Sequence, residues 1–581
     1  MRTSRLPAPA ALHLMFFFCL FFSVCLLFST HRARFIFPST TTSANATFGK
    51  QAEFGARLLM INQYLWIAIV GGIVAFLTGC GVGMNDLANA FGTTYGSRVL
   101  TLKQIIVLAS VCELAGAISL GGEVTSTISG GIADASQFAS EPYILMYGML
   151  CALGAAFLWL LLATILTLPV SSTHSIAGGI IGFALVYSGA SGVSWSKKKN
   201  EFPFVSGVVP IIASWFISPL LAGIAAATVF SIIRALVLRP ANSVQRALYA
   251  VPVIVCVAFF LESFFVLFKG AKARLHWSVE KALWVAAVIG ACAGIVSIAF
   301  IPLLRRRVRW MTERAEEQAA EAARSAAEAE QQAAAGSFVE EQQEDAPAAD
   351  GTAPGNVAAG GTMDADAKAA KKSNEPVTGG IVGPSDNSSN SGRQVTESEL
   401  PFTVQLFDNR AEYVFRYLQV FTAVCASFAH GASDVSNAMG PFAAIYAIYR
   451  TRAVVSVSDT PMWILFLGGG GLVLGLATFG VRIMRLLGER IATITPSRGF
   501  SAELSTALVV SFASGYGVPI SSTHCITGAV VAISVVDVGF LKLRWIIIAK
   551  LYAGWIMTLV ICGVISALFF AQGIYSPSRA G

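Results

Sequence analysis

Two short polar phrases occur twice in this chain, in the same order and at nearly the same spacing. The first copies are NDLANA at 85–90 and PVSSTH at 169–174, and the second copies are SDVSNA at 433–438 and PISSTH at 519–524. All four lie within long apolar stretches, where ionised side chains are costly and usually mark functional sites. Polar interruptions at matching places in the two halves of a membrane chain are typical of the binding site of a secondary transporter.

The acidic phrases supply ligands for a small cation. Asp86 and Asn89 are three residues apart and share one face of a helix, and Asp434 and Asn437 repeat this arrangement. We expect the flanking glycines to let each helix bend or unwind, so that backbone carbonyls join the carboxylate and amide oxygens around a small cation. The alternative is that each aspartate only caps a broken helix or pairs with an arginine.

The Ser-Thr phrases supply donors for an anion. A short apolar run follows each histidine, at 175–187 and 525–536, and a run of this length favours a re-entrant hairpin over a full span. Serine and threonine are preferred N-caps, and their hydroxyls form an anion site together with the free N–H groups of a helix N-terminus. Two facing hairpin tips would surround a tetrahedral oxyanion with donors. The alternative is that Ser-Ser-Thr only caps a buried helix.

The two kinds of site depend on each other. Asp86 and Asp434 would repel an oxyanion unless cations lie between them, and none of the four phrases contains arginine, the usual clamp for oxyanions. If a bound cation raises the affinity for the anion, the anion raises the affinity for the cation by the same factor. The pattern therefore predicts symport of a cation with an oxyanion.

Three histidines and two glutamates adjoin these phrases. His174, His430 and His524 could carry protons near neutral pH, although we favour a role in orienting backbone or hydroxyl partners. Glu113 and Glu503 are lone carboxylates beside apolar stretches, at positions that are not equivalent in the two copies. Each is either a cation ligand or a structural partner, and the residues alone leave this open.

The composition requires that membrane helices position these phrases. The chain has 55% hydrophobic and only 13% charged residues and a mean hydropathy of +0.67, whereas soluble proteins carry about 25% charged residues. We predict an all-α polytopic membrane protein with about ten to twelve spans. The net charge of +7 is scattered along membrane flanks, which argues against nucleic-acid binding. The cysteines lie in apolar segments without a CxxC pair, so neither a zinc site nor a disulfide framework is indicated.

The domain organisation follows from shifts in composition. Residues 1–34 predict a signal peptide or signal anchor, and 35–63 an extracytoplasmic segment with a glycosylation acceptor at Asn45. The two membrane halves span 64–310 and 411–572, and 573–581 form a tail. The basic cluster at 305–309 places the segment 311–410 in the cytosol. This segment starts with an Ala-Glu-Gln-rich part suited to a solvated helix and is otherwise expected to be a disordered loop.

The duplicated phrases resemble those of the inorganic phosphate transporter (PiT) family of sodium–phosphate symporters. GMNDLANAFG at 83–92 is similar to the GANDVANAFG signature of that family, and GASDVSNA at 431–438 is similar to its second copy. The two Pro-x-Ser-Ser-Thr-His phrases look like the family's paired hairpins. SWFISPL at 214–220 and TPSRGFSAEL at 495–504 also look like eukaryotic members. The resemblance covers about 64–310 and 410–572.

This resemblance implies the fold, the substrate and the roles of the site residues. It implies a fold of two inverted repeats with re-entrant hairpins. It also implies that phosphate is the substrate and that sodium is the coupling ion, with no other metal and no cofactor. A homodimer is possible, and the plasma membrane is the simplest location. The phosphate-binding role falls on Ser171, Ser172, Thr173, Ser521, Ser522 and Thr523. The cation-binding role falls on Asn85, Asp86, Asn89, Asp434 and Asn437, and the coupling carboxylates are Glu113 and Glu503. Ser433 departs from the family's asparagine, which alters one ligand, and the first 60 residues have no clear counterpart.

Three other functions compete with a sodium–phosphate symporter. A proton-coupled symporter of phosphate or another oxyanion satisfies the same chemistry with a different cation. A phosphate-sensing membrane receptor would bind phosphate but barely transport it, and saturable phosphate flux would exclude this function. A membrane hydrolase is the weakest alternative, because Ser-Ser-Thr-His lacks the context of a nucleophile elbow and one catalytic centre does not explain the duplication. We therefore predict a transporter rather than an enzyme.

Overall fold

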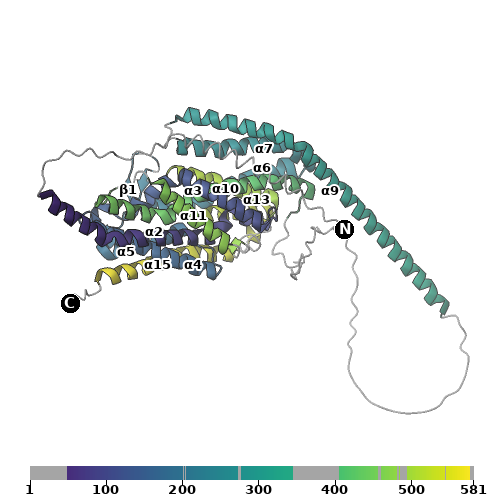
Figure 1. The fold of residues 1–581 in the computed structure, drawn as a ribbon. Coiled ribbons are helices and arrows are strands. Elements are labelled where there is room, and N and C mark those ends of the chain that lie inside the picture. Colours follow the sequence, from purple (N-terminus) through teal and green to yellow (C-terminus); the bar gives the residue numbers. More distant parts are fainter. Residues whose placement is uncertain are drawn as a thin grey trace, which may run out of the picture. The chain divides into compact units, whose positions relative to one another are not determined.

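The protein is described here from a computed structural model that is almost entirely helical (Figure 1). It describes residues 49–200, 202, 204–271, 277–343, 405–455, 460–480, 483–484, 494–543 and 545–575. The signal segment, the Asn45 acceptor and the end of the tail lie outside these residues. Two units are distinguished, Met1–Val308 with Phe402–Gly581 and Arg309–Pro401, and the site lies within the first.

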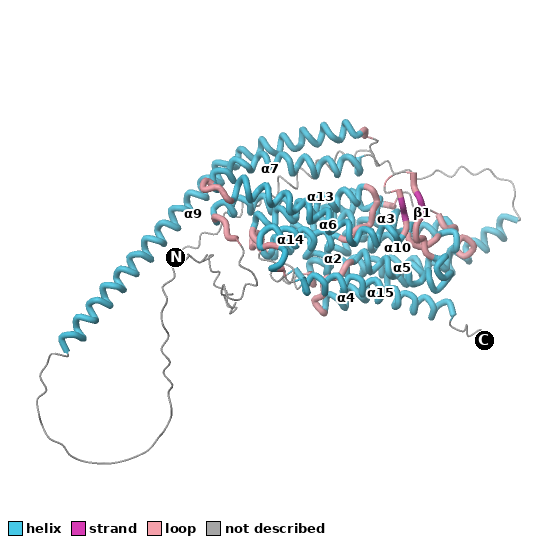
Figure 2. Tube along the Cα trace, turned by 180° about the vertical axis from the view of Figure 1, so that it is seen from behind, coloured by secondary structure: helices cyan, strands magenta, loops and turns pink. Residues whose placement is uncertain are grey.

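The described residues form an all-α membrane fold, as the composition predicts. Eight helices are long and apolar enough to cross a membrane, and Met462–Thr478 (α11) and Ser522–Val538 (α14) are shorter apolar helices. Figure 2 shows that the only strands drawn are a short pair, Lys197–Lys198 (β1) and Val205–Ser206 (β2). The eight candidate spans are Tyr64–Gly96, Leu102–Gly131, Pro142–Ile165, Ser172–Gly192, Val208–Leu238, Ser243–Phe268, Val279–Glu328 and Trp545–Tyr575.

Helices of the two sequence halves interleave within one compact unit. Helix α2 (Gly49–Gly96) of the first half packs against α11 of the second, and α3 (Leu102–Gly131) packs against α10 (Asn409–Thr451). In the same way, α5 (Ser172–Ser188) packs against α15 (Trp545–Tyr575), and α14 packs against α6 (Val208–Ile233). Each pairing has a matched counterpart, so the phrases of one half are held next to helices of the other.

The glycines beside the acidic phrases serve close helix packing. A Cβ on Gly83 would lie 2.1 Å from the Leu472 carbonyl oxygen, and one on Gly431 would lie 2.2 Å from the Glu113 carbonyl oxygen. Helices α2 and α10 run without a break through both phrases. The expectation that these glycines unwind the helices is therefore wrong, because their lack of a side chain is used to bring two intact helices into backbone contact.

Each Ser-Thr phrase lies at the bend between two helices. The first bend joins α4 (Pro142–Ile165) to α5, and the second joins α13 (Pro496–Gly515) to α14. Ser171 and Ser521 are the N-caps of α5 and α14, and each side chain accepts a hydrogen bond from the backbone N–H of the histidine three residues later. Both phrases thus start helices as their residue types predict.

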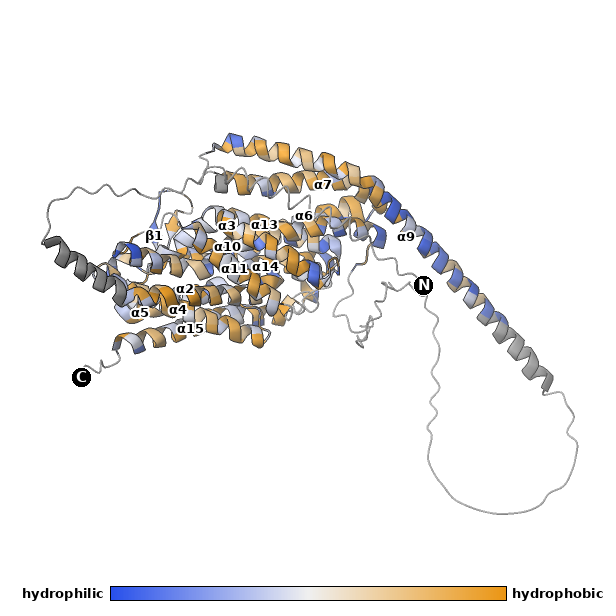
Figure 3. Ribbon diagram, in the orientation of Figure 1, coloured by the Kyte–Doolittle hydropathy of each residue, from blue (hydrophilic) through white to orange (hydrophobic). Residues whose placement is uncertain are grey.

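Part of the predicted disordered loop is helical. Helix α9 (Val279–Gln343) continues through Arg305 and beyond, and Figure 3 shows its colour changing from apolar orange to polar blue along its length. Alanine, glutamate and glutamine are strong helix formers, which accounts for the helix where nothing apolar is available to pack. Residues 344–404 of the predicted loop lie outside the described part of the chain.

Candidate functional site

The tips of the two hairpins meet inside the first unit. The Thr173 hydroxyl donates a hydrogen bond to the Ile520 carbonyl oxygen at 3.2 Å, and the ring centroids of His174 and His524 are 4.7 Å apart. Both Ser-Ser-Thr triplets are buried. Two helix N-termini with their hydroxyls therefore converge, which is the arrangement that favours an anion between them.

Two asparagines cross between the halves to reach these hydroxyls. The Asn89 amide of α2 donates to Thr523 at 2.8 Å and to Ser522 at 3.2 Å, at the tip of the second hairpin. The Asn437 amide of α10 donates to Ser172 at 3.0 Å and to Thr173 at 3.2 Å, at the tip of the first. A hydroxyl that accepts from an amide keeps its own proton for another acceptor. The asparagines therefore orient the hydroxyls as donors.

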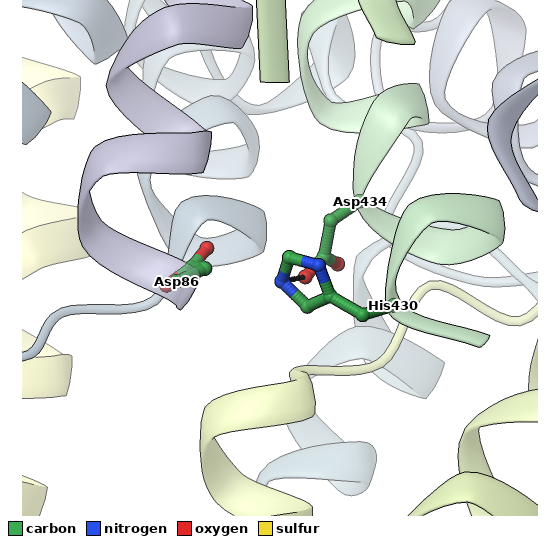
Figure 4. Close-up of side chains that lie close together, drawn as sticks. All are labelled: Asp86, His430 and Asp434. Atoms are coloured by element: carbon green, nitrogen blue, oxygen red, sulfur yellow. Dashed lines mark ion pairs between the residues drawn. The ribbon is translucent and has the colours of Figure 1, made fainter. Parts of the chain in front are cut away.

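An acidic centre lies next to the crossed tips. One ligand atom from each of Asp86, His430 and Asp434 lies within 4.8 Å of the others, and all three residues are buried. Figure 4 shows that Asp86 comes from a separate helix and faces His430 and Asp434. The Ser522 hydroxyl also donates to Asp434 at 2.7 Å. Serine hydroxyls of the predicted anion site thus contact the predicted cation site directly.

His430 joins Glu113 to this centre. Its Nε2 lies 2.8 Å from an Asp434 oxygen, and its Nδ1 lies 3.2 Å from a Glu113 oxygen. The contact of His430 with Asp434 has one signal in the sequence, the position of His430 four residues before Asp434 on one helix face. Of the two glutamates left open, Glu113 is therefore placed at the acidic centre.

Asp86 is the carboxylate best placed to take up a cation. The Ser172 hydroxyl and the Asn89 amide are within hydrogen-bonding reach of its carboxylate, but neither oxygen is fixed by a close, well-aligned hydrogen bond among the residues described. Two buried carboxylates this close repel each other strongly unless positive charge or a proton lies between them. A small cation bound by Asp86 and Asp434 would supply that charge with hard oxygen ligands.

Asn85 occupies a different position from the other predicted cation ligands. Its amide nitrogen donates to the Leu168 carbonyl oxygen at 3.0 Å, and its amide oxygen accepts from the Val170 N–H at 3.0 Å. Both ends of the amide are therefore used to hold the loop of the first hairpin. Ser433, its counterpart in the second copy, has too short a side chain to reproduce this pair of bonds.

Glu503 lies in a separate polar cluster on α13. Thr94 and Thr422 donate hydroxyl hydrogen bonds to it at 2.6 Å and 2.8 Å, the Gln419 amide donates at 3.2 Å, and Thr93 also donates. Sequence reasoning missed these four partners, since their only signal was a threonine pair just after the first acidic phrase. Both carboxylate oxygens of Glu503 therefore accept hydrogen bonds from side chains of other helices.

The remaining two histidines pack against aromatic rings. The ring of His174 lies 4.5 Å from that of Trp215 on α6, and the ring of His524 lies 3.9 Å from that of Trp555 on α15. These contacts fix the histidines behind the hairpin tips. Their placement agrees with a role in positioning the tips.

A helical membrane core with paired hairpin tips and a buried acidic centre defines a secondary transporter. The family model described as the phosphate transporter family matches residues 82–566. The chain belongs to that family.

Two relatives are similar over nearly their whole length. The phosphate-repressible phosphate permease pho-4 of Neurospora crassa is 30% identical, over 89% of this chain and 99% of the permease. Sodium-dependent phosphate transporter 1 of Rattus norvegicus is also 30% identical, over 92% of this chain and 98% of the rat protein. A solved structure titled the sodium-dependent phosphate transporter covers 88% of this chain and 100% of its own, with 26% identity and a TM-score of 0.64.

Proposed function

We propose that this protein is a sodium-coupled symporter of inorganic phosphate. The observation that carries the proposal is the direct contact between a phosphate-type site, the hydroxyl-bearing hairpin tips, and a cation-type site, the Asp86–Asp434 pair. The names of relatives such as sodium-dependent phosphate transporter 1 support both the substrate and the ion.

Phosphate is held by the hairpin tips in this proposal. The tips offer hydroxyls that accept from the asparagine amides and can donate outward, together with N–H groups at two helix N-termini. Binding exchanges the carboxylate contacts of the serines for contacts with phosphate. The residues assigned to phosphate are Ser171, Ser172, Thr173, Ser521, Ser522 and Thr523.

Sodium binds at the acidic centre and makes phosphate binding possible. Asp86 and Asp434 are the charged ligands, and Asn89 and Asn437 contribute through their amide oxygens while orienting the hydroxyls. Glu113 acts on the centre through His430. Glu503 binds a further cation in its own cluster, and Asn85 positions the first hairpin.

Transport follows by alternating access between two inverted repeats. Sodium binds first and cancels the repulsion between Asp86, Asp434 and the incoming phosphate. One set of helices then rocks against the other around the site and releases both solutes on the far side. We place the protein in the plasma membrane, as a transporter without enzymatic activity that can form a homodimer.

Uptake of radiolabelled phosphate into proteoliposomes containing the full chain tests this function. We expect uptake when a sodium gradient is imposed, and we expect Asp86→Asn to lose most of it because the affinity for sodium falls. Asp134→Asn, in the loop after α3, is the matched control and retains uptake. Uptake driven only by a proton gradient would refute sodium coupling, but phosphate would remain the substrate. Phosphate binding without uptake under either gradient would indicate a sensor.

A further inference from the structure

A further buried carboxylate lies outside the site described so far. Glu262 is on α7 (Ser243–Phe265), within a candidate membrane span. It is only 7% exposed. A carboxylate inside a membrane segment is costly and is by default a functional residue. The duplicated phrases do not include it.

Glu262 faces polar groups of two other helices. From α13 the Ser511 hydroxyl lies beside the carboxylate, and from α10 the Cys425 thiol is close enough to interact with its charge. The Ser511 hydroxyl is within hydrogen-bonding reach of the carboxylate, but among the described residues neither this hydroxyl nor the Glu262 Oε1 atom forms a close, well-aligned hydrogen bond. Within the same part of the chain, Glu262 forms no ion pair with a basic side chain. Its charge is therefore uncompensated by protein.

The surroundings of Glu262 are otherwise apolar. One turn before it, Phe259 stacks on Phe421 of α10 with ring centroids 4.0 Å apart. One turn after it, Phe265 meets Phe512 of α13 edge to face at 5.7 Å. Helix α9 contributes Ile289 and Ala293 to the same cluster. An ionised carboxylate in such a place would be neutralised by a bound cation or by a proton.

The ligand set around Glu262 favours a proton. Metal cations that prefer oxygen need several oxygen ligands, whereas the groups found beside Glu262 are one hydroxyl and one thiol. A protonated carboxyl needs only one acceptor, which the Ser511 oxygen can provide.

We propose that Glu262, with Ser511, is a proton-binding site that loads and unloads during the transport cycle. This inference rests on the proposed function, because it assigns a second ion to the same cycle. When the proton is bound, the carboxyl is neutral among the side chains of α7, α10 and α13. When the proton leaves, the carboxylate is a charge in apolar surroundings without a basic partner among the described residues.

Carbodiimide labelling of the wild-type protein tests the site without requiring transport. Dicyclohexylcarbodiimide reacts with protonated carboxyls in apolar surroundings, and peptide mass spectrometry locates the adduct. We expect an adduct on Glu262 at neutral pH that decreases as the pH is raised and is unaffected by sodium. Absence of the adduct at every pH would overturn the inference. Protection by sodium would overturn it in favour of a metal site.

Transport by a neutral variant tests whether the proton leaves during the cycle. We expect Glu262→Gln to retain sodium-driven phosphate uptake but to lose most of the dependence of the uptake rate on pH. Glu123→Gln, which changes an exposed carboxylate on α3, is the control and keeps the wild-type pH profile. A Glu262→Gln profile identical to the wild type would show that Glu262 is a permanently neutral structural residue. If wild-type uptake itself were absent, the proposed function would fail, while labelling would still report on the site.

Discussion

The two acidic phrases are nearly identical in sequence but have different surroundings. Asp434 contacts His430 at 2.8 Å and accepts from Ser522, whereas Asp86 has Ser172 and Asn89 within reach but no close, well-aligned hydrogen bond among the described residues. The residue four positions before Asp86 is Val82, where the second copy has His430. One carboxylate is thus held by the protein, and the other is available to a ligand.

The helices opposite the phrases show the same difference. Gly83 packs against the backbone of Leu472, and its counterpart Gly431 packs against the backbone of Glu113. Leu472 and Glu113 therefore occupy matching places in the two halves, one apolar and one acidic. The buried charge network of Glu113, His430 and Asp434 therefore forms at only one of the two matched contacts, the one between α3 and α10. The two aspartates are not interchangeable.

Between the two hairpin loops, it is the first that has additional hydrogen bonds to the acidic phrase of its own half. Asn85 fastens the loop of the first hairpin with two hydrogen bonds, and Ser433 cannot fasten the second in this way. The loop of the first hairpin is therefore joined to α2 of its own half through Asn85, whereas the second hairpin contacts α10 through Ser522 and Asp434 instead.

The largest expected effect of this asymmetry is on stability. His430→Gln leaves Glu113 and Asp434 buried without their shared partner, and breaking a buried ion pair costs about 3–5 kcal/mol. We expect a large drop in the thermal unfolding midpoint of the purified protein. Val82→Thr at the matching place in the first half is the control and should change the midpoint much less. Equal effects of the two variants would refute the difference between the halves.

The aspartates should respond differently to neutralisation. Asp86→Asn removes repulsion from Asp434, so the unfolding midpoint should stay the same or rise, while sodium activation of phosphate uptake weakens. Loss of one charged ligand corresponds to about 2–3 kcal/mol, or roughly a hundredfold in affinity. Asp434→Asn should lower both the midpoint and the sodium affinity, because it also removes one of the two carboxylate partners of His430. A destabilised Asp86→Asn protein of normal sodium affinity would contradict this assignment.

The hairpin comparison predicts a moderate, local effect. Asn85→Ala removes two buried hydrogen bonds and should destabilise the first hairpin by about 2 kcal/mol. Hydrogen–deuterium exchange should then become faster at 166–171. Ser433→Ala should leave exchange at 516–521 unchanged. If Asn85→Ala instead abolished sodium activation without faster exchange, Asn85 would be a cation ligand.

Where the halves are alike, matched variants should behave alike. Asn89→Ala and Asn437→Ala each remove one amide that orients the hydroxyls of the opposite hairpin. Each should weaken phosphate binding by about 1 kcal/mol, or roughly fivefold. Equilibrium binding of labelled phosphate measures both. A tenfold difference between them would show that the asymmetry extends to the phosphate site.

The sequence was most informative about short-range features. The spacing of Asp86 and Asn89 identifies a shared helix face, and the Ser-Ser-Thr triplets identify helix starts, because both depend on local geometry. The prediction of unwound helices failed because glycine permits either a bend or a close approach. Only the neighbouring helix, α11 or α3, decides between these outcomes.

Long-range contacts lay beyond the reach of sequence reasoning. The crossing of Asn89 to the second hairpin, and of Asn437 to the first, depends on which helices pack together. The donors around Glu503 come from α2 and α10, which are distant in the sequence from Glu503 on α13. The same holds for the contact between His430 and Glu113. Periodicity places such residues on a face without specifying the partner.

The most direct test of the account is whether phosphate and sodium bind as a linked pair. Equilibrium binding of labelled phosphate to the purified full-length protein would be measured over a series of sodium concentrations, and sodium binding over a series of phosphate concentrations. The account predicts that each ligand raises the affinity for the other by the same factor, and that Asp86→Asn removes this effect. Phosphate affinity that does not change with sodium would contradict it.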